Sequence, residues 1–400
     1  MRSCFISKYP PIQGGISSQT YWLTKALGDK GHKVFIATNA NEVEKEYRES
    51  ISKTDNSLIS PKNVSVFSTD PSPEANPMHI PTSKTYVERL SNLAIQVVQD
   101  NEIEIIDSWY LVPYGVAGLV TKFIVKKPFI VRHAGSDLGR FLPSPAFNTL
   151  LNEILKNADK IVTYEDTKHQ FLSMGVSEDK LLVFPKIFTD PEAFNPKVEP
   201  FDLGKIVKRF NFGLAVITYI GKIPYYFETK GLVEILHAVK NINEDFLLLF
   251  IANGTGMFRF KKMVREMGLE NKSFFMGFLP PWTIPSIISA STCVIAVQYD
   301  FPFPSFISSI PLETMAVGKC PVISHEMHAC EPYSELMDGE SVLVVDPKNV
   351  SQFRKTLEEV IRNRELSKGI GLNAYRIFKQ VDNFNEVVSR TIQMYEEVGV

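Results

Sequence analysis

The stretch SFISSIPLETMAVGKCPVIS, residues 305–324, determines how the C-terminal half of this 400-residue chain can fold. Pro311 suits a first helical position, because its φ angle is preset and it has no amide to leave unpaired. We therefore expect a helix that begins near Ser309 to Pro311 and ends at Gly318. The apolar residues that follow, 320–323, have the composition of a buried strand.

Glu313 gives this short helix a functional interpretation. The free amides at a helix N-terminus attract phosphate, and Glu313 falls in the first turn, where its carboxylate could receive sugar hydroxyls. A phosphate site beside a carboxylate suits a nucleotide whose ribose and diphosphate bind together. A capped core helix with an acidic first turn explains the same residues equally well.

The segment also resembles the donor-site motif of the family 4 retaining glycosyltransferases of the GT-B fold, roughly E-P-F-G-x-x-P-L-E-A-M-A-x-G-x-P-V. The sequence departs from that motif at Ser305, which stands at the family's first glutamate, and at Ser308, which stands at its glycine. Eight residues match it: Pro311, Leu312, Glu313, Met315, Ala316, Gly318, Pro321 and Val322.

The composition is ordinary for a soluble globular protein. The chain is 44% hydrophobic and 22% charged with a net charge of −2, and it is long enough for two sizeable cores. No basic excess indicates nucleic acid. The start, MRSCFISK, is too short and polar for a signal peptide, and no run approaches the length of a membrane span. We expect a cytoplasmic protein, with peripheral membrane association left open.

The cysteines and histidines form neither a disulfide framework nor a complete metal site. The spacing H-x-x-H-x-C of His325, His328 and Cys330 lacks a four-ligand set and matches no common zinc pattern. No Asp-x-Asp pair occurs, so no bridging divalent metal is implied, and we expect no metal and no cofactor. Three cysteines in or beside apolar runs are expected to be buried thiols: Cys4, Cys293 and Cys320.

Short apolar runs alternate with helical patterns along the chain, which predicts an α/β fold with mostly parallel, doubly wound sheets. Residues 41–80 are polar and are expected to form a long surface insertion. The first series of strands is expected at 2–7, 34–38, 103–107, 128–132, 160–164 and 181–184. The second is expected at 215–221, 246–252, 273–276, 293–297, 320–324 and 342–345.

A proline-rich segment, residues 185–202, separates the two series and is a natural linker. We therefore expect two Rossmann-like domains facing a cleft, residues 1–190 and 191–380. Residues 381–400 are expected to return to the N-terminal domain as a helix, with Phe384, Val388, Thr391 and Tyr395 on one stripe. The resemblance implies the GT-B fold, with an acceptor-side N-terminal domain and a donor-binding C-terminal domain.

Two segments of the N-terminal half are candidates for the site. Gly14 and Gly15, in the loop YPPIQGGIS, remove side chains where a backbone could approach a phosphate or sugar. His133 and Asp137 follow a buried strand, at the end where open α/β sheets place ligands. A tight turn explains the glycines equally well. For His133 we favour a functional role over a structural one, and for Asp137 we favour neither role over the other. The family has a P-x-x-G-G loop and a histidine at these places.

Three segments of the C-terminal half are further candidates. Lys222 and Lys230 lie in GKIPYYFETKG, where two cations could neutralise a diphosphate leaving group, although solvated surface lysines are the commoner case. The family has G-R-x(n)-K-G here, so Lys222 replaces an arginine. Gly254, in NGTG, resembles the family's G-x-G, and a simple turn explains it almost as well. Phe278 and Leu279, in GFLPPW, resemble the loop that contacts the nucleotide base.

The resemblance implies a retaining transfer of a sugar from a nucleotide-sugar donor to a glycan, lipid-linked or small-molecule acceptor. Glu313 would hold the ribose, and amides of Ser309 and Ile310 would stabilise the departing diphosphate together with Lys222 and Lys230. His133 would position the sugar, Gly14 and Gly15 would close the cleft, and Ser305 would stand where the family's sugar-contacting carboxylate lies.

Two other functions stay open. A catalytically inactive sugar-nucleotide-binding subunit is favoured by Ser305, because a serine has no charge to offer the sugar. A nucleotide-sugar 2-epimerase would need carboxylates placed for proton abstraction, and the sequence shows no such cluster near the expected site. Donor hydrolysis without a partner would distinguish an enzyme from an inactive subunit.

Overall fold

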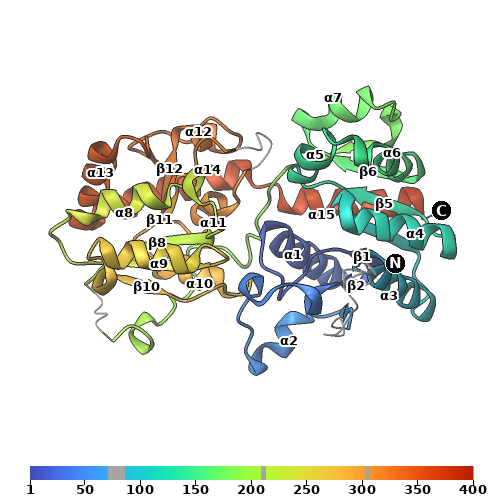
Figure 1. Ribbon diagram of the computed structural model, residues 1–400, viewed down its shortest axis with the longest axis horizontal. Helices are drawn as coiled ribbons and strands as arrows, with labels where there is room; N and C mark the ends of the chain where they lie inside the picture. Colours follow the sequence, from blue (N-terminus) through green and yellow to red (C-terminus); the bar gives the residue numbers. More distant parts are fainter. Residues whose placement is uncertain (71–85, 209–212, 302–306, 400) are drawn as a thin grey trace, which may run out of the picture. The chain divides into compact units, whose positions relative to one another are not determined.

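A computed structural model describes residues 1–70, 86–208, 213–301 and 307–399. These residues form two compact units, each built on one parallel sheet (Figure 1). The first unit comprises residues 1–186 and 385–399, and the second comprises residues 187–301 and 307–384.

The first unit has a seven-stranded parallel sheet in the order β3-β2-β1-β4-β5-β6-β7. The strands are β1 (Arg2–Ile6), β2 (Lys33–Thr38), β3 (Val64–Ser68), β4 (Ile105–Trp109), β5 (Phe129–Arg132), β6 (Lys160–Thr163) and β7 (Leu181–Val183). The helices are α1 (Gly15–Asp29), α2 (Asn56–Ile59), α3 (Tyr86–Asp100), α4 (Val116–Val125), α5 (Ser136–Phe141), α6 (Asn148–Asn157) and α7 (Glu165–Ser173). Helix α15 (Phe384–Val398) also belongs to this unit, except for its first residue.

The second unit has a six-stranded parallel sheet in the order β10-β9-β8-β11-β12-β13. The strands are β8 (Ala215–Lys222), β9 (Phe246–Asn253), β10 (Ser273–Phe275), β11 (Cys293–Ala296), β12 (Cys320–Ser324) and β13 (Leu343–Val345). The helices are α8 (Leu232–Lys240), α9 (Met257–Glu266), α10 (Ile284–Ala290), α11 (Ile310–Ala316), α12 (His325–His328), α13 (Val350–Arg362) and α14 (Arg364–Val381).

Both sheets confirm the predicted doubly wound α/β architecture. In each, the chain builds strands outward in one direction and then returns to continue beside the first strand. Helices cover the sheets between successive strands (Figure 1). Central strands such as β9 are buried along nearly their whole length, as a parallel sheet covered on both faces requires. The helix expected near Ser309 to Pro311 begins at Ile310.

The prediction that residues 41–80 form only a surface insertion is wrong in part. Val64–Ser68 forms β3, an edge strand that pairs in parallel with β2. The strand has the sequence VSVFS, and the Phe67 ring stacks on Phe35 with centroids 6.5 Å apart. Such a short run among polar neighbours gives a weak strand signal, and its pairing with β2 decides the outcome.

A buried ion pair lies at the centre of the first unit. The Arg132 guanidinium, at the end of β5, donates from Nε to Asp107 Oδ1 at 2.9 Å and from Nη2 to Asp107 Oδ2 at 2.8 Å. Tyr395 Oη, on α15, donates to the same Oδ2 at 2.8 Å. All three side chains are almost completely buried, so α15 is joined to the sheet through a polar contact shielded from water.

Aromatic rings enclose the guanidinium. The Arg132 carbon lies 5.5 Å from the Trp109 ring centroid and 5.7 Å from that of Phe184, within the range of cation–π attraction. The guanidinium carbon of Arg390, also on α15, lies 4.5 Å from the centroid of the same Phe184 ring. The polar contacts of the C-terminal helix with the first unit therefore include the Tyr395 hydrogen bond, the stacked Arg390 cation and an ion pair between Lys160 and Glu397.

Replacing Asp107 should destabilise the first unit strongly. Asp107→Ala leaves the Arg132 charge buried without its partner, and we expect the free energy of unfolding to fall by about 3–5 kcal/mol. Urea denaturation followed by circular dichroism measures the change. Lys368→Ala, which removes an exposed ion pair with Glu365, is the control and should cost at most about 1 kcal/mol. Equal losses for the two variants would contradict the central role of the buried pair.

Candidate functional site

Each sheet has one point at which the strand order reverses. In the first unit this point lies between β1 and β4, and in the second it lies between β8 and β11. Ligands of open α/β sheets bind outside the carboxyl ends of the strands at such a point. Most of the predicted site residues follow β1, β5, β8, β9 or β11, so the topology places them at or beside these two positions.

The loop after β1 contains the predicted glycines. Gly14 has φ 143°, a conformation that other residues rarely adopt, and it precedes the first residue of α1. A Cβ added at Gly15 would meet no atom within 4 Å, so the space there is open. Lys8 Nζ lies 5.1 Å from the ring centroid of Tyr110, which links this loop to the one after β4 across the switch point.

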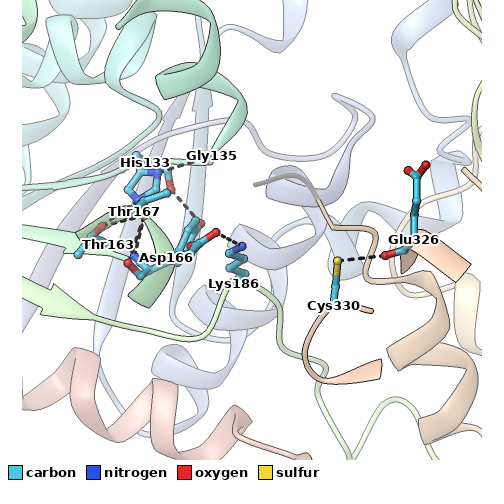
Figure 2. Close-up of polar contacts among 9 residues, drawn as sticks. His133, Gly135, Thr163, Asp166, Thr167, Lys186, Glu326 and Cys330 are labelled. Atoms are coloured by element: carbon cyan, nitrogen blue, oxygen red, sulfur yellow. Dashed lines mark hydrogen bonds and ion pairs between the residues drawn. The ribbon is translucent and has the colours of Figure 1, made fainter. Parts of the chain in front are cut away.

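His133 is held by hydrogen bonds on both ring nitrogens (Figure 2). Nδ1 accepts from the Gly135 amide at 3.0 Å, which leaves the proton on Nε2. Nε2 lies 3.1 Å from the hydroxyl oxygens of both Thr163 and Thr167. Burial of the ring, with a smaller effect of the Lys186 charge, lowers the pKa of His133 to about 3. The ring is therefore neutral and fixed.

Asp137 has its oxygens occupied by backbone amides. Oδ2 accepts from the Leu111 amide at 2.8 Å, while Oδ1 accepts from the amides of Ala134 and Leu138 at 3.0 Å each. Burial raises the pKa of this carboxyl, and the amide bonds oppose that rise. The geometry makes Asp137 the link between the loop after β4 and the loop after β5.

Lys222 and Lys230 come together at the β8/β11 switch point. Lys222 is the last residue of β8, and Lys230 Nζ donates to Oε1 of Gln298, just after β11, at 3.3 Å. Lys230 Nζ also lies 4.2 Å from the ring centroid of Phe301. Burial, with a smaller effect of the positive charge of Lys222, lowers the pKa of Lys230 to about 8. A bound phosphate group would offset both the burial of the Lys230 charge and its repulsion by Lys222.

Close backbone packing explains two glycines beside these lysines. Gly231 has φ 66°, and a Cβ there would lie 2.4 Å from the carbonyl oxygen of Val297. Gly254, the predicted donor-binding glycine, has φ 133°, and a Cβ there would lie 2.5 Å from the Ile223 carbonyl oxygen. Both positions therefore require glycine for the loops to fit, whatever else the loops do.

Glu313 lies in the first turn of α11, as predicted, and its side chain is buried. Its Oε1 accepts from the Ser309 hydroxyl at 2.9 Å. Burial raises the pKa of Glu313 to about 7, and the bond from Ser309 limits the rise. The Ile310 amide, predicted to face a phosphate, donates to the Ser308 hydroxyl oxygen at 3.3 Å. A serine hydroxyl can rotate, so that amide is capped by a replaceable partner.

Tyr333 is a residue that sequence reasoning missed. Its hydroxyl donates to the Ser308 carbonyl oxygen at 2.5 Å and accepts from the Leu312 amide at 3.2 Å. The ring is completely buried. Tyr333 therefore ties the segment before α11 to the first turn of the helix that carries Glu313. No motif surrounds it in the sequence, and only the fold brings it to this position.

The remaining predicted residues are spread over other parts of the structure. Phe278 is buried, Leu279 is partly exposed, and Ser305 lies outside the described residues. His328 Nε2 lies 2.8 Å from the Leu336 carbonyl oxygen. Cys330 Sγ donates to the Glu326 carbonyl oxygen at 3.3 Å (Figure 2). Across the ranges that the structure describes, no three His, Cys, Asp or Glu side chains gather as a metal site would need.

The family model of the glycosyl transferases group 1 matches residues 207–377, which contain every candidate of the second unit. This part of the chain is therefore similar to that family. The chain is also 21% identical over its whole length to an uncharacterized glycosyltransferase of Methanocaldococcus jannaschii, covering 99% of that relative. A 2-deoxystreptamine glucosyltransferase of Streptomyces kanamyceticus is 22% identical over 62% of this chain.

The alignments reach only part of some relatives. They span 64% of the Streptomyces enzyme and 60% of a second uncharacterized glycosyltransferase of M. jannaschii, which is 24% identical over 61% of this chain.

Solved structures show the same fold over nearly the whole chain. Sucrose-phosphate synthase of Thermosynechococcus elongatus superposes with a TM-score of 0.68 at 15% identity, covering 99% of both chains. HepE of Anabaena, solved in complex with UDP-glucose, gives 0.68 at 16% identity, covering 98% of this chain and 99% of its own. The chain therefore has the GT-B fold, with two Rossmann-like domains.

Within the described ranges, none of the helices is long and apolar enough to cross a membrane.

Removing the Tyr333 hydroxyl should loosen the start of α11. Tyr333→Phe leaves the Leu312 amide and the Ser308 carbonyl without their partner, and we expect a loss of about 1–3 kcal/mol in the free energy of unfolding. Chemical denaturation measures it. Tyr226→Phe, at a ring that is 77% exposed, is the matched control and should be neutral. A neutral effect of both changes would show that the Tyr333 hydroxyl does not hold the helix.

Proposed function

We propose that the protein is a retaining glycosyltransferase that moves a sugar from a nucleotide-sugar donor to an acceptor hydroxyl in glycoconjugate synthesis. The observation that carries the proposal is the second switch point. There Lys222 ends β8, Lys230 with its lowered pKa comes after that strand, and α11 carries the buried carboxylate of Glu313 in its first turn. The group 1 family match and the GT-B fold support it.

In this proposal the second unit binds the donor. Glu313 receives the ribose hydroxyls, and Ser309 is its partner until they arrive. Lys222 and Lys230 stabilise the negative charge that grows on the departing diphosphate. Amides of Ser309 and Ile310 add hydrogen bonds once the Ser308 hydroxyl rotates away. The acceptor hydroxyl attacks the anomeric carbon on the face that the diphosphate leaves.

Other predicted residues have supporting roles. Phe278 and Leu279 belong to the segment that we assign to the nucleotide base, and Gly254 to the turn beside the diphosphate. In the first unit, Gly14 and Gly15 allow close approach of a backbone to the sugar. His133, predicted to position that sugar, is buried with both ring nitrogens already bonded, so we assign it an indirect role in which it fixes the loop after β5.

Asp137 takes an indirect part in the proposed site. Its oxygens bind three amides, so it shapes the loops after β4 and β5 rather than the sugar itself. Ser305 would occupy the place of the family's sugar-contacting carboxylate and would set the choice of donor sugar. We also propose a glycan, lipid-linked or small-molecule acceptor and a cytoplasmic location with peripheral association with a membrane.

The second candidate function is a sugar-nucleotide-binding subunit without activity. The observation that favours it is Ser305, which removes a charge from the sugar end of the donor site. Such a subunit would bind nucleotide tightly and neither transfer nor hydrolyse the sugar. Donor turnover by the isolated chain therefore separates the two functions.

Donor turnover without metal is the direct test of the proposal. UDP-glucose is the first donor to try, because HepE is solved in complex with it and one relative is named a glucosyltransferase. Other nucleotide sugars follow, ranked by the rise in melting temperature that each produces. We expect slow hydrolysis of one donor that survives EDTA. Binding without turnover would favour the inactive subunit, and rescue by manganese after EDTA would contradict the role given to the lysines.

The pH dependence of donor affinity should identify Glu313 and Lys230. Glu313 is ionised above its pKa of about 7, and Lys230 is protonated below its pKa of about 8. Both charges are present together only between these values, so affinity for the donor should be greatest there and fall on either side. The diphosphate of a nucleotide sugar keeps its charge over this range and adds no titration of its own.

Two variants test which group causes each fall in donor affinity. Glu313→Gln should remove the fall in affinity at low pH and weaken donor binding by about 1.5–3 kcal/mol. Lys230→Met should remove the fall in donor affinity at high pH and lower kcat roughly 10²- to 10³-fold. The exposed Lys262 supplies the control Lys262→Met, which should retain the wild-type profile. Calorimetric titration across the window measures affinity, and a flat wild-type profile would exclude these two groups as the donor's charged contacts.

A further inference from the structure

The segment after α1 and β2 forms a short antiparallel ribbon with the glycine loop of the first unit. Ile12 and Arg48 form a bridge between the two segments. The Gln13 amide donates to the Tyr47 carbonyl oxygen at 3.0 Å, and the Glu49 amide donates to the Pro11 carbonyl oxygen at 2.8 Å. Residues 47–49 therefore lie directly beside the loop that leads into Gly14.

The ribbon is fixed in place by its own side chains. Arg48 Nε donates to the Val43 carbonyl oxygen at 2.7 Å, and its Nη2 donates to the Asn41 carbonyl oxygen at 2.7 Å. Ile12, on the same face as Arg48, is 2% exposed and packs inward. Successive side chains of a paired extended segment point to opposite faces, so Gln13 and Glu49 share the other face of the ribbon.

That second face carries two buried oxygens without a partner. Glu49 is only 9% exposed, and within the described ranges neither its Oε2 nor the Oε1 of Gln13 has a hydrogen-bond donor. Burial raises the pKa of Glu49 well above its usual value. Two acceptor atoms left unsatisfied beside a switch point are costly to the fold and are explained by a ligand that donates to them.

We infer that Glu49 and Gln13 form the acceptor-recognition surface of the first unit, where they accept hydrogen bonds from a small polyhydroxylated acceptor. This inference rests on the proposed function and names the part of the site that receives the sugar. The donating groups are the acceptor's hydroxyls or an ammonium group on it, since either satisfies a carboxylate. Glu49 is a positioning residue for the acceptor, next to the glycines that allow close approach.

Two Glu49 variants and a matched control test the assignment. Glu49→Met removes the acceptor atoms, Glu49→Gln removes only the charge, and Glu46→Gln changes an exposed residue of the same segment. Each is assayed with the donor selected above and with glucose or glucosamine as acceptor probes, which differ by one ammonium group. The readouts are the acceptor KM, donor hydrolysis without acceptor, and the melting temperature.

We expect Glu49→Met to raise the acceptor KM roughly 10- to 100-fold, the scale of one hydrogen bond to a charged group, with donor hydrolysis unchanged. Glu49→Gln should have a comparable effect if the ammonium group is recognised and a smaller one if only hydroxyls are. Glu46→Gln should match the wild type. Because the carboxylate has no internal partner, the melting temperature of Glu49→Met should equal or exceed that of the wild type.

Three results would overturn the assignment. A wild-type acceptor KM in Glu49→Met, with or without a lower melting temperature, would mark Glu49 as structural. Transfer to neither probe by a protein that hydrolyses its donor would refute the acceptor class. Absence of donor binding and turnover in the wild type would instead refute the proposed function, and with it this inference, so the two failures are distinguishable.

Discussion

The first unit depends on a charge that is buried away from water. Arg132, the last residue of β5, meets Asp107 in the middle of β4, and Tyr395 completes the hydrogen bonding from α15. A buried ion pair of this kind adds little net stability over an apolar packing, but breaking it is costly, so it favours one arrangement of its elements over others. The two strands it joins lead directly into the loops that carry Tyr110, His133 and Asp137.

Both units hold the loops at the carboxyl ends of their strands by giving backbone groups a side-chain partner. Asp137 binds three amides in the first unit, and Tyr333 binds one amide and one carbonyl oxygen in the second. Neither group is left to meet a ligand directly. Loops fixed in this way present glycines, serines and lysines in defined positions, which lowers the entropy lost when a ligand binds.

The fold could be predicted from the sequence because buried parallel strands give long apolar runs with helical patterns between them. Glu313 could be placed in the first turn of α11 because Pro311 marks the start of that helix. Tyr333, Gln298 and Glu49 could not be predicted, since their positions depend on tertiary contacts far along the chain. The partners of His133 were hidden for the same reason, because Thr163 and Thr167 come from β6 and α7.

The anchoring of α15 has a consequence for the order in which the protein is made. Tyr395 belongs to the first unit, yet the whole of the second unit lies between it and Asp107 in the chain. Domains generally fold as units during synthesis, the N-terminal one first. Here the ribosome must finish the second unit before the first can bury its central carboxylate completely. The first unit is therefore translated first but completed last. Until then its Arg132–Asp107 pair stays open to water and to chaperones.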